Sequence, residues 1–282
     1  MLPQPQPHTT LRHLASTTNP LARYARLLVL QARMAGVGAM QYRTDFWLKG
    51  VMSLVWMGVA LVPLVSVFHQ RAAVRGWTFP EALVVVGCFS LMKGVLEGAI
   101  SPSLTSVVEH VRKGTLDFLL LKPVDAQFLV STAKLEPWRV MDVLGALVIF
   151  GIAFRRLGHP PPVRAVLLAA ALLLVAILVL YALWILVVSA SFWVVKVDNL
   201  SYLFGSLFDA GRWPISVFRG ALWFAFTFVF PLALMTSYPA MALLGRLRPG
   251  VALLGLGGGL LFAGLARAVW RRALGFYTSA SS

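Results

Sequence analysis

Six runs of about twenty predominantly apolar residues restrict the fold of this chain more than any other feature. They lie at 47–68, 79–99, 138–157, 164–195, 216–236 and 250–270. A helix of about 20 apolar residues crosses the ~30 Å hydrocarbon core of a bilayer, and a helix satisfies its own backbone polar groups in lipid. The runs therefore predict six transmembrane helices. The fourth run is longer than a span requires, so we expect its helix to tilt or to project beyond the bilayer.

The composition excludes a water-soluble protein. Apolar residues make up 59% of the 282 residues and charged residues only 12%, whereas a soluble domain carries about 25% charged residues. So few charged side chains cannot cover a water-soluble surface, and the high apolar content excludes intrinsic disorder. We therefore predict an all-α integral membrane protein.

Basic residues greatly outnumber acidic ones, with 25 Lys and Arg against 10 Asp and Glu. In a soluble protein this excess would indicate nucleic-acid binding. In a membrane protein it is typical of loops that face the cytoplasm and anionic lipid, so we predict membrane lipid and no nucleic acid as a partner. With the N-terminus inside, 17 basic residues fall on the cytoplasmic side, Arg212 and Arg219 among them, and seven on the outer side. This bias predicts that both termini, including a tail at 271–282, are cytoplasmic.

The first 46 residues precede the first span. Residues 1–19 are polar and contain no apolar stretch typical of a signal peptide, so we expect a flexible segment. Residues 20–46 are predicted to form an interfacial helix, because Arg23, Arg26 and Arg33 fall on one side of a helix in its first part. An ordinary cytosolic helix is the alternative interpretation.

The longest segment between spans, 100–137, contains a second amphipathic helix. Pro102 fits a helix start and Gly114 a helix stop. Apolar residues recur with the spacing of one helical face, at Leu104, Val107, Val108 and Val111. The charged side consists of Glu109, Arg112 and Lys113. The sequence therefore predicts a short cytoplasmic helix at about 102–113, between the second and third spans.

The chain lacks the common signatures of nucleotide binding and hydrolysis. No lysine follows a glycine, so the G-x-x-x-x-G-K-[ST] phosphate loop is absent. Neither G-x-S-x-G nor H-E-x-x-H occurs, and the five histidines have no metal-ligand spacing. We predict no catalytic residue, no metal site and no cofactor in this chain. The glycine-rich run at 255–259 is interpreted as a helix-packing surface.

Two ionisable residues lie inside the second predicted span. Lys93 and Glu97 are spaced i, i+4, so they share a helix face and can form an ion pair. Such a pair is either structural or part of a transport pathway. Gly94 and Gly98 form a G-x-x-x-G motif beside it and predict close helix packing. Asp142, near the end of the third span, is predicted to be a solvated or capping group.

Several local motifs occur in an order known from one family. The stretch at 111–123 reads VRKGTLDFLLLKP, similar to an R-x-G-T-L-D-x-L-L-x-K-P motif, and residues 42–46 read YRTDF. Prolines at 214, 231 and 239 mark the fifth predicted span and the segment after it. Together with the six runs and the two amphipathic helices, these motifs resemble one bacterial subfamily of type-2 ABC transporter permeases. The resemblance covers most of residues 20–270.

The resemblance implies a partner and a site. In this family the helix between spans two and three is a coupling helix, which docks into a groove on a separate ATP-binding subunit that carries ATP and Mg²⁺. The implied coupling residues are Leu104, Val108, Glu109, Arg112, Lys113, Gly114, Thr115, Leu116 and Asp117. A second permease, either the same chain or a different one, is the other implied partner. The implied location is the bacterial cytoplasmic membrane.

The function implied by the resemblance is ATP-driven export of a hydrophobic or amphipathic compound, such as a drug, a lipid or a secondary metabolite. The segment 237–249 is then a re-entrant gate, with Pro231 and Pro239 as kink or gate residues, although a plain surface loop is also possible. Two other functions stay open. One is an ion-coupled carrier that uses Lys93 and Glu97 as a relay, and the other is a membrane-embedded enzyme.

Overall fold

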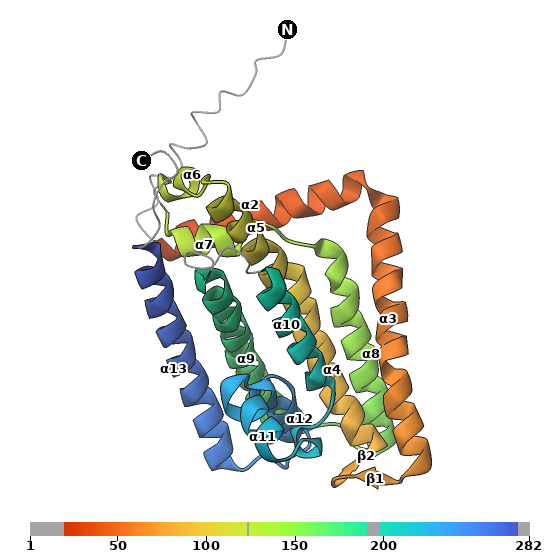
Figure 1. Ribbon diagram of the computed structural model, residues 1–282. Coiled ribbons are helices and arrows are strands. Elements are labelled where there is room, and N and C mark those ends of the chain that lie inside the picture. The colour runs from red at the N-terminus through yellow and green to blue at the C-terminus, as the bar shows by residue number, and fades with distance from the viewer. Residues whose placement is uncertain (1–19, 123, 191–197, 276–282) are drawn as a thin grey trace.

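The computed structural model describes residues 20–122, 124–190 and 198–275. The predictions for 1–19 and for most of the tail therefore lie outside the described residues. The described chain is helical except for loops and a two-stranded antiparallel hairpin, β1 (Ala73–Val74) and β2 (Trp77–Thr78) (Figure 1). An all-α membrane architecture is thereby confirmed.

Five long helices run side by side (Figure 1). They are α3 (Arg43–Gln70), α4 (Phe79–Val95), α8 (Val140–Leu157), α9 (Val163–Ala190) and α13 (Pro249–Leu274). Helix α2 (Pro20–Gln41) lies across one end of this bundle, and Tyr42 separates it from α3. The short helices α5 (Ser101–Arg112), α6 (Asp117–Leu120) and α7 (Ala126–Ser131) gather at the same end.

The prediction of six spans is not confirmed. Four helices of the described chain are long and apolar enough to cross a membrane, and a fifth span results if one bent helix pair is counted. Helix α8 runs beside α3 and α4 (Figure 1), but its 18 residues include Asp142, Arg155 and Arg156. The observed helices nevertheless occupy the apolar runs at 47–68, 79–99, 164–195 and 250–270 closely, apart from 191–197, which are not described.

The second span is longer than predicted, because α5 continues α4 without a break. The two are joined by a π-helical turn, Leu96–Ile100, and together form a 33-residue helix, Phe79–Val111. Pro102 has no N–H to pair with the carbonyl of Gly98, and that oxygen instead accepts a hydrogen bond from the backbone N–H of Glu136 at 2.8 Å. The predicted cytoplasmic helix is therefore the end of a long helix rather than a separate element in a loop.

The predicted span at 216–236 is a bent helix pair, and the bend lies at the predicted kink residue Pro231. Two helical arms, Gly220–Val229 and Ala233–Leu243, meet at 72°. The break contains Pro231, which cannot donate a backbone hydrogen bond. The first arm includes α11 (Gly220–Phe224), and the second ends with α12 (Tyr238–Leu243). The predicted re-entrant segment 237–249 thus begins within the second arm, and the bend itself lies before it.

A helix absent from the prediction precedes the bent pair. Helix α10 (Asp198–Asp209) runs beside α4 and is followed by a 3₁₀ turn, Ala210–Arg212 (Figure 1). The guanidinium carbon of Arg212 lies 5.6 Å from the ring centre of Phe89, in the middle of α4. The placement of Arg212 in a cytoplasmic loop is therefore wrong. The charge of Arg212 interrupts the apolar pattern here, so the sequence does not predict a helix inside the bundle at this point.

Small residues set the closest helix contacts. A Cβ atom at Gly94 would lie 3.2 Å from the Cβ of Asp142, and one at Gly98 would lie 3.1 Å from the Cβ of Arg139. The predicted close packing at this G-x-x-x-G motif is confirmed. In the glycine-rich run of α13, a Cβ at Gly259 would come within 2.4 Å of Val175 on α9, which confirms a packing role for that run.

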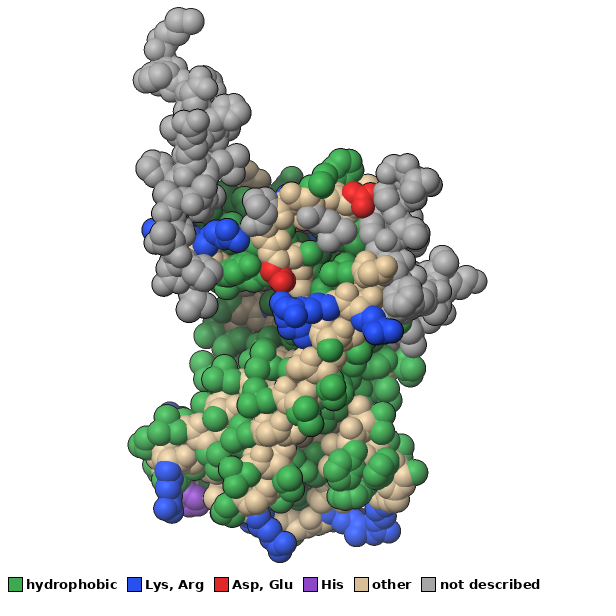
Figure 2. All heavy atoms as spheres, turned by 90° about the vertical axis from the view of Figure 1, so that its left-hand side faces the viewer, with side chains coloured by type: hydrophobic (Ala, Val, Ile, Leu, Met, Phe, Trp, Pro, Cys, Tyr) green, Lys and Arg blue, Asp and Glu red, His purple; other side chains and the backbone are tan. Residues whose placement is uncertain are grey.

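The outer surface of the bundle is apolar. Figure 2 shows hydrophobic side chains over a broad middle zone, with Lys and Arg gathered towards its two ends. Large apolar side chains on the long helices point outward; Trp56 of α3 is 65% exposed and Leu254 of α13 is 77% exposed. Exposed apolar surface of this extent is unfavourable in water, whereas the hydrocarbon of a bilayer solvates it well. The chain is therefore a multi-pass membrane protein.

Candidate functional site

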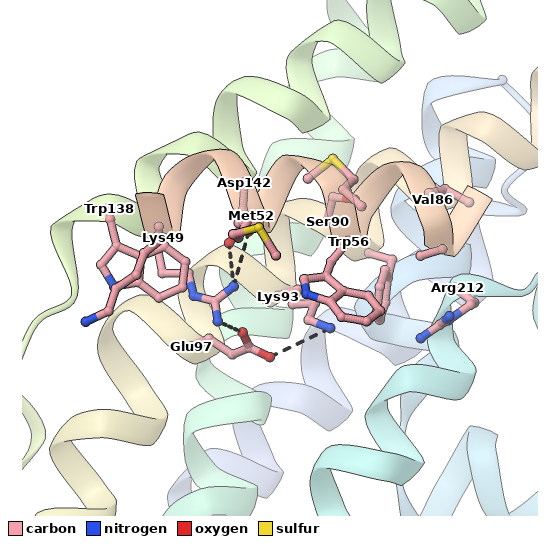
Figure 3. Close-up of a pocket in the computed structure, with 15 residues that line it drawn as sticks. Lys49, Met52, Trp56, Val86, Ser90, Lys93, Glu97, Trp138, Asp142 and Arg212 are labelled. Carbon is pink, nitrogen blue, oxygen red and sulfur yellow. Dashed lines mark hydrogen bonds and ion pairs between the residues drawn. The ribbon is translucent and has the colours of Figure 1, made fainter. Parts of the chain in front are cut away.

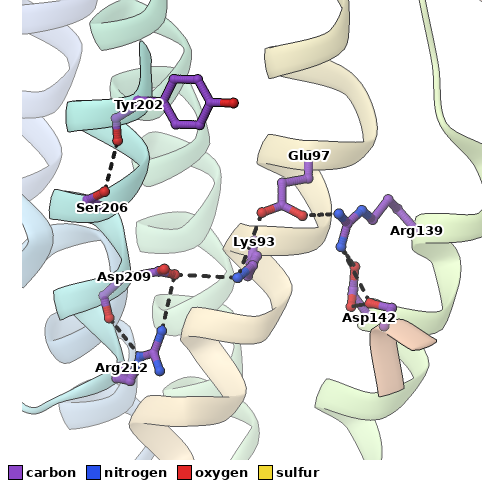
Figure 4. A network of polar contacts seen from close by, with 9 residues as sticks. Lys93, Glu97, Arg139, Asp142, Tyr202, Ser206, Asp209 and Arg212 are labelled. Atoms are coloured by element: carbon purple, nitrogen blue, oxygen red, sulfur yellow. Dashed lines mark hydrogen bonds and ion pairs between the residues drawn. The ribbon is translucent and has the colours of Figure 1, made fainter. Parts of the chain in front are cut away.

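Six ionisable side chains form a continuous row of ion pairs across the bundle (Figure 4). We call this row the charge ladder; its members are Arg212, Asp209, Lys93, Glu97, Arg139 and Asp142. Each member is paired with its neighbour in the row, and the three cations balance the three carboxylates. Because α10, α4 and α8 each contribute members, the ladder fastens three helices together.

Lys93 is at the centre of the ladder. Its Nζ lies 3.7 Å from Glu97 Oε1, the pair that the i, i+4 spacing predicts, and 3.4 Å from Asp209 Oδ1 on α10. Glu97 also pairs with Arg139, and Arg212 Nη2 lies 3.3 Å from Asp209. The contact of Lys93 to α10 could not be predicted, because Asp209 lies between two predicted spans, 116 residues further along the chain.

Asp142 lies in the first turn of α8 but is not solvated, so that alternative of its prediction is wrong. It is 3% exposed, accepts a hydrogen bond from Ser53 Oγ of α3, and pairs with Arg139 Nη1 at 2.9 Å. The close contact of α8 with Gly94 covers this carboxylate, so it needs a cation beside it. Arg139 meets that need, and its guanidinium also lies over the ring of Trp138, 3.9 Å from the ring centre.

A cavity of about 290 Å³ lies beside the charge ladder, between α3, α4 and the start of α8 (Figure 3). One part of its wall is apolar and consists of Met52, Trp56, Met57, Ala60, Val86 and Phe89. Another part is charged and consists of Lys49, Lys93, Glu97, Arg139, Asp142 and Arg212. The side chains of Lys93 and Glu97 are 32% and 33% exposed. The cavity thus joins an apolar surface to ionised groups that remain accessible.

The residues that the resemblance assigned to coupling divide into buried and exposed groups. Leu104, Val108 and Leu116 are buried in the core of the chain, so they do not face outward. Glu109 and Lys113 are exposed and lie 3.5 Å apart as an i, i+4 ion pair. The backbone of Arg112 ends α5, and its side chain lies outside the described atoms.

The remaining residues of this set form the turn after α5. Gly114 has φ +64°, a left-handed conformation that favours glycine. The N–H of Thr115 donates to the carbonyl of His110 at 2.9 Å, and its hydroxyl lies 2.8 Å from His110 Nδ1. Asp117 then begins α6. These contacts fix the direction in which α6 leaves the end of α5.

Two large apolar side chains in α6 and just beyond it point into the surroundings. Phe118 is 71% exposed and Leu121 is 82% exposed. We call Glu109, Lys113, Phe118, Leu121 and Lys122 the coupling surface. Phe118 and Leu121 were not among the predicted site residues, although an apolar stretch between Asp117 and Lys122 directly follows the helix.

A second polar cluster holds α7 against the bundle, and we call it the α7 anchor. Asp125 accepts a hydrogen bond from the N–H of Phe128 and pairs with Arg267 Nη2 of α13 at 2.9 Å. Arg267 Nη1 donates to Gln127, whose amide donates to the hydroxyl of Tyr181 on α9. Nothing in the sequence indicated that these residues meet.

The pKa of Asp125 in the α7 anchor lies below its ordinary value. Partial burial alone would raise the pKa, but the hydrogen bonds from the N–H of Phe128 and from Arg267, together with the charge of Arg267, outweigh it. Asp125 is therefore ionised at neutral pH and keeps its ion pair with α13.

An ion pair and hydrogen bonds also join elements at the opposite end of the bundle. Arg246, between α12 and α13, pairs with Glu81 in the first turn of α4 and donates to the carbonyl of Gly76 at 3.3 Å. Trp77 Nε1 of the hairpin donates to Ser216 at 3.1 Å. Pro239 is buried at the start of α12, and Pro231 lies in the break of the bent pair.

Comparison with known families identifies the class. Residues 54–281 match the family model described as ABC-2 family transporter protein. Since this match covers most of the chain, the chain belongs to that family. Its members are membrane components of transporters that generally work with an ATP-binding subunit. No curated protein and no solved structure matches the chain.

The described residues contain no cluster of side chains suited to a metal ion. Among residues 20–122, 124–190 and 198–275, no group of three or more His, Cys, Asp and Glu side chains could hold a metal ion. The carboxylates of the charge ladder are instead occupied by basic side chains. The arrangement is that of a transporter component with paired charges beside a cavity.

Proposed function

We propose that this chain is the transmembrane permease subunit of an ATP-driven ABC transporter in the bacterial cytoplasmic membrane. The family match over residues 54–281 carries this proposal. The sequence has no phosphate loop, so the energy comes from a separate subunit that binds ATP and Mg²⁺. The R-x-G-T-L-D-x-L-L-x-K-P stretch is the part of the chain that we assign to that partnership.

The ATP-binding subunit docks on the coupling surface. Phe118 and Leu121 supply apolar anchors and Glu109 and Lys113 a charged rim, which is the usual anatomy of an interaction hot spot. Leu104, Val108 and Leu116 support this surface, because they pack α5 and the turn after it onto the core that includes Met92 and Leu96. Movement of the partner is thereby transmitted directly into α4, since α4 and α5 form one helix.

Both termini face the cytoplasm in this proposal. Helix α2, the coupling surface and the C-terminal end of α13 lie at one end of the bundle (Figure 1), and the last turn of α13 carries Arg271 and Arg272. Basic residues favour the cytoplasmic side. Moving Arg212 out of the cytoplasmic count leaves the direction of the bias unchanged. Helix α2, with Arg23, Arg26 and Arg33, then lies in the inner membrane interface.

The transporter exports an amphipathic or hydrophobic compound and works as a pair of permeases. The two-part wall of the cavity supports amphipathic cargo. A carrier driven by Lys93 and Glu97 alone is less well supported, because each of these groups is held by two partners in the charge ladder. The bent pair at Pro231, with Pro239 in its second arm, is our candidate for the gate at the outer end.

Co-purification with the ATP-binding subunit tests the proposal. Leu121→Ser should abolish co-purification and permease-dependent ATP hydrolysis, while Leu121→Met, which keeps an apolar anchor, should retain both. Membrane insertion should be equal in the two variants. If the Leu121→Ser and Phe118→Ser variants both assemble and couple like the wild type, the assignment of the coupling surface is wrong.

A further inference from the structure

The cavity beside the charge ladder lies at a depth where ionised groups are costly. Lys93 is 14 residues beyond Phe79 along the second span, which is about 21 Å at 1.5 Å per residue. Hydrocarbon cannot solvate a side chain there that keeps a third of its surface exposed. The exposed side of the ladder must therefore meet water, another protein or a polar ligand group.

More cations than carboxylates line the cavity. Four cations line it, namely Lys49, Lys93, Arg139 and Arg212, against the two carboxylates of Glu97 and Asp142. Asp142 is buried and already engaged by Ser53 and Arg139. Two further carboxylates, Asp209 between Lys93 and Arg212 and Asp45 at 2.8 Å from Lys49, balance these cations but do not line the cavity. The surface offered to a ligand thus favours an anion.

Lys93 and Arg212 are placed to share one anionic group. Both lie near the ring of Phe89, with Nζ of Lys93 5.8 Å and the guanidinium carbon of Arg212 5.6 Å from the ring centre. The contacts of Lys93 to its two carboxylates, at 3.4 and 3.7 Å, exceed the roughly 2.7–2.9 Å of a direct charge-assisted hydrogen bond. The ammonium group can therefore turn towards a ligand without leaving its ion pairs.

We propose that this cavity binds an amphipathic anion. A single anionic head, such as a sulfonate, carboxylate or phosphate, contacts Lys93 and Arg212 (Figure 3). The apolar chain lies along Met52, Trp56 and Phe89. That the bound anion is cargo rests on the proposed function; the binding itself does not, because it needs neither ATP nor the ATP-binding subunit.

Photolabelling of the full chain in phosphatidylcholine nanodiscs tests the site. The probe is a long-chain alkyl sulfonate with a diazirine in its chain, and the saturable labelling is that displaced by excess unlabelled sulfonate. Mass spectrometry should find this labelling on peptides that contain Met52, Trp56 or Phe89. The trimethylammonium compound with the same chain should bind about tenfold more weakly or worse, because it meets an excess of cations.

Variants separate the site from general lipid contact. Lys93→Met and Arg212→Met should each weaken saturable sulfonate labelling about tenfold, the effect of losing one charge-assisted hydrogen bond, whereas Lys93→Arg should stay close to the wild type. Arg155→Met, at the exposed opposite end of α8, is the matched control and should change nothing. If Lys93→Met does not fold, Arg212→Met decides the question.

Three results would overturn the proposal: equal labelling of these peptides by the ammonium probe, wild-type affinity in both Met variants, or no saturable labelling of them. Competition by added phosphatidylglycerol would identify the anion as a bilayer lipid. Its absence, with saturable sulfonate labelling intact, would identify a soluble amphipath. A chain that binds sulfonate but does not couple to an ATP-binding subunit would contradict the proposed function and leave this site standing.

Discussion

The charge ladder and the α7 anchor both join helices by ion pairs, but in different surroundings. The ladder includes Asp142, whose side chain is 5% exposed, and Arg139, which is 19% exposed. The anchor pairs Asp125 and Arg267, which are 37% and 42% exposed. Removing one partner of a buried pair leaves an uncompensated charge, whereas an exposed pair is worth little. Similar contacts should thus contribute very differently to stability.

The largest loss of stability is expected in the charge ladder, at the buried residue Asp142. Asp142→Leu removes the acceptor of Ser53 and one of the two carboxylates that hold Arg139. We expect the free energy of unfolding to fall by about 3–5 kcal/mol, measured by SDS-induced unfolding of the purified chain in mixed micelles. A loss under about 1 kcal/mol would show that the ladder is not a buried structural network.

An intermediate effect is expected where helices meet without charges. Gly259→Val places a side chain against Val175 and Leu234, where a Cβ alone would lie 2.4 and 3.2 Å away. We expect a loss of about 1–3 kcal/mol from overpacking. Gly258→Val is the matched control, because a Cβ there meets nothing within 4 Å. Equal unfolding curves for the two variants would contradict the observed packing of α13 on α9.

The smallest effect is expected at the α7 anchor. Arg267→Met should lower the free energy of unfolding by at most about 1 kcal/mol at pH 7. The folded-state pKa of Asp125 is lowered, so the contribution of its ion pair is present above the unfolded pKa of about 3.9 and is lost as the pH falls through the folded value. The difference between wild type and variant should shrink only below about pH 4. A difference that disappears by pH 6 would exclude Asp125 as its source.

The same contrast explains what could be predicted from the sequence. Long apolar runs, the amphipathic pattern of Leu104 to Val111 and the G-x-x-x-G motif at Gly94 are local signals, and each corresponds to an observed feature. The burial of Asp142 was missed because a charge counted alone indicates solvent. Only the packing of α8 on α4 shows that Arg139 neutralises it.

The region around α10 could not be predicted for a related reason. Asp209 and Arg212 interrupt the apolar pattern, so the segment looked like a loop, yet Lys93 of α4 pairs with Asp209 across the bundle. Pro231 did indicate a kink, but a proline gives no angle, and the 72° bend depends on the packing of the second arm against α4 and α9. An ion pair between two segments that are distant in the chain produces no periodic pattern in the sequence of either segment.

The central claim is that this chain moves an amphipathic compound with energy from a partner that docks on the coupling surface. Transport into inside-out vesicles that contain the permease and the ATP-binding subunit tests it most directly, with the alkyl sulfonate as the transported probe. The account predicts ATP-dependent uptake that Leu121→Ser abolishes and Leu121→Met preserves. Uptake that persists without ATP hydrolysis, or that is equal in Leu121→Ser and the wild type, would contradict it.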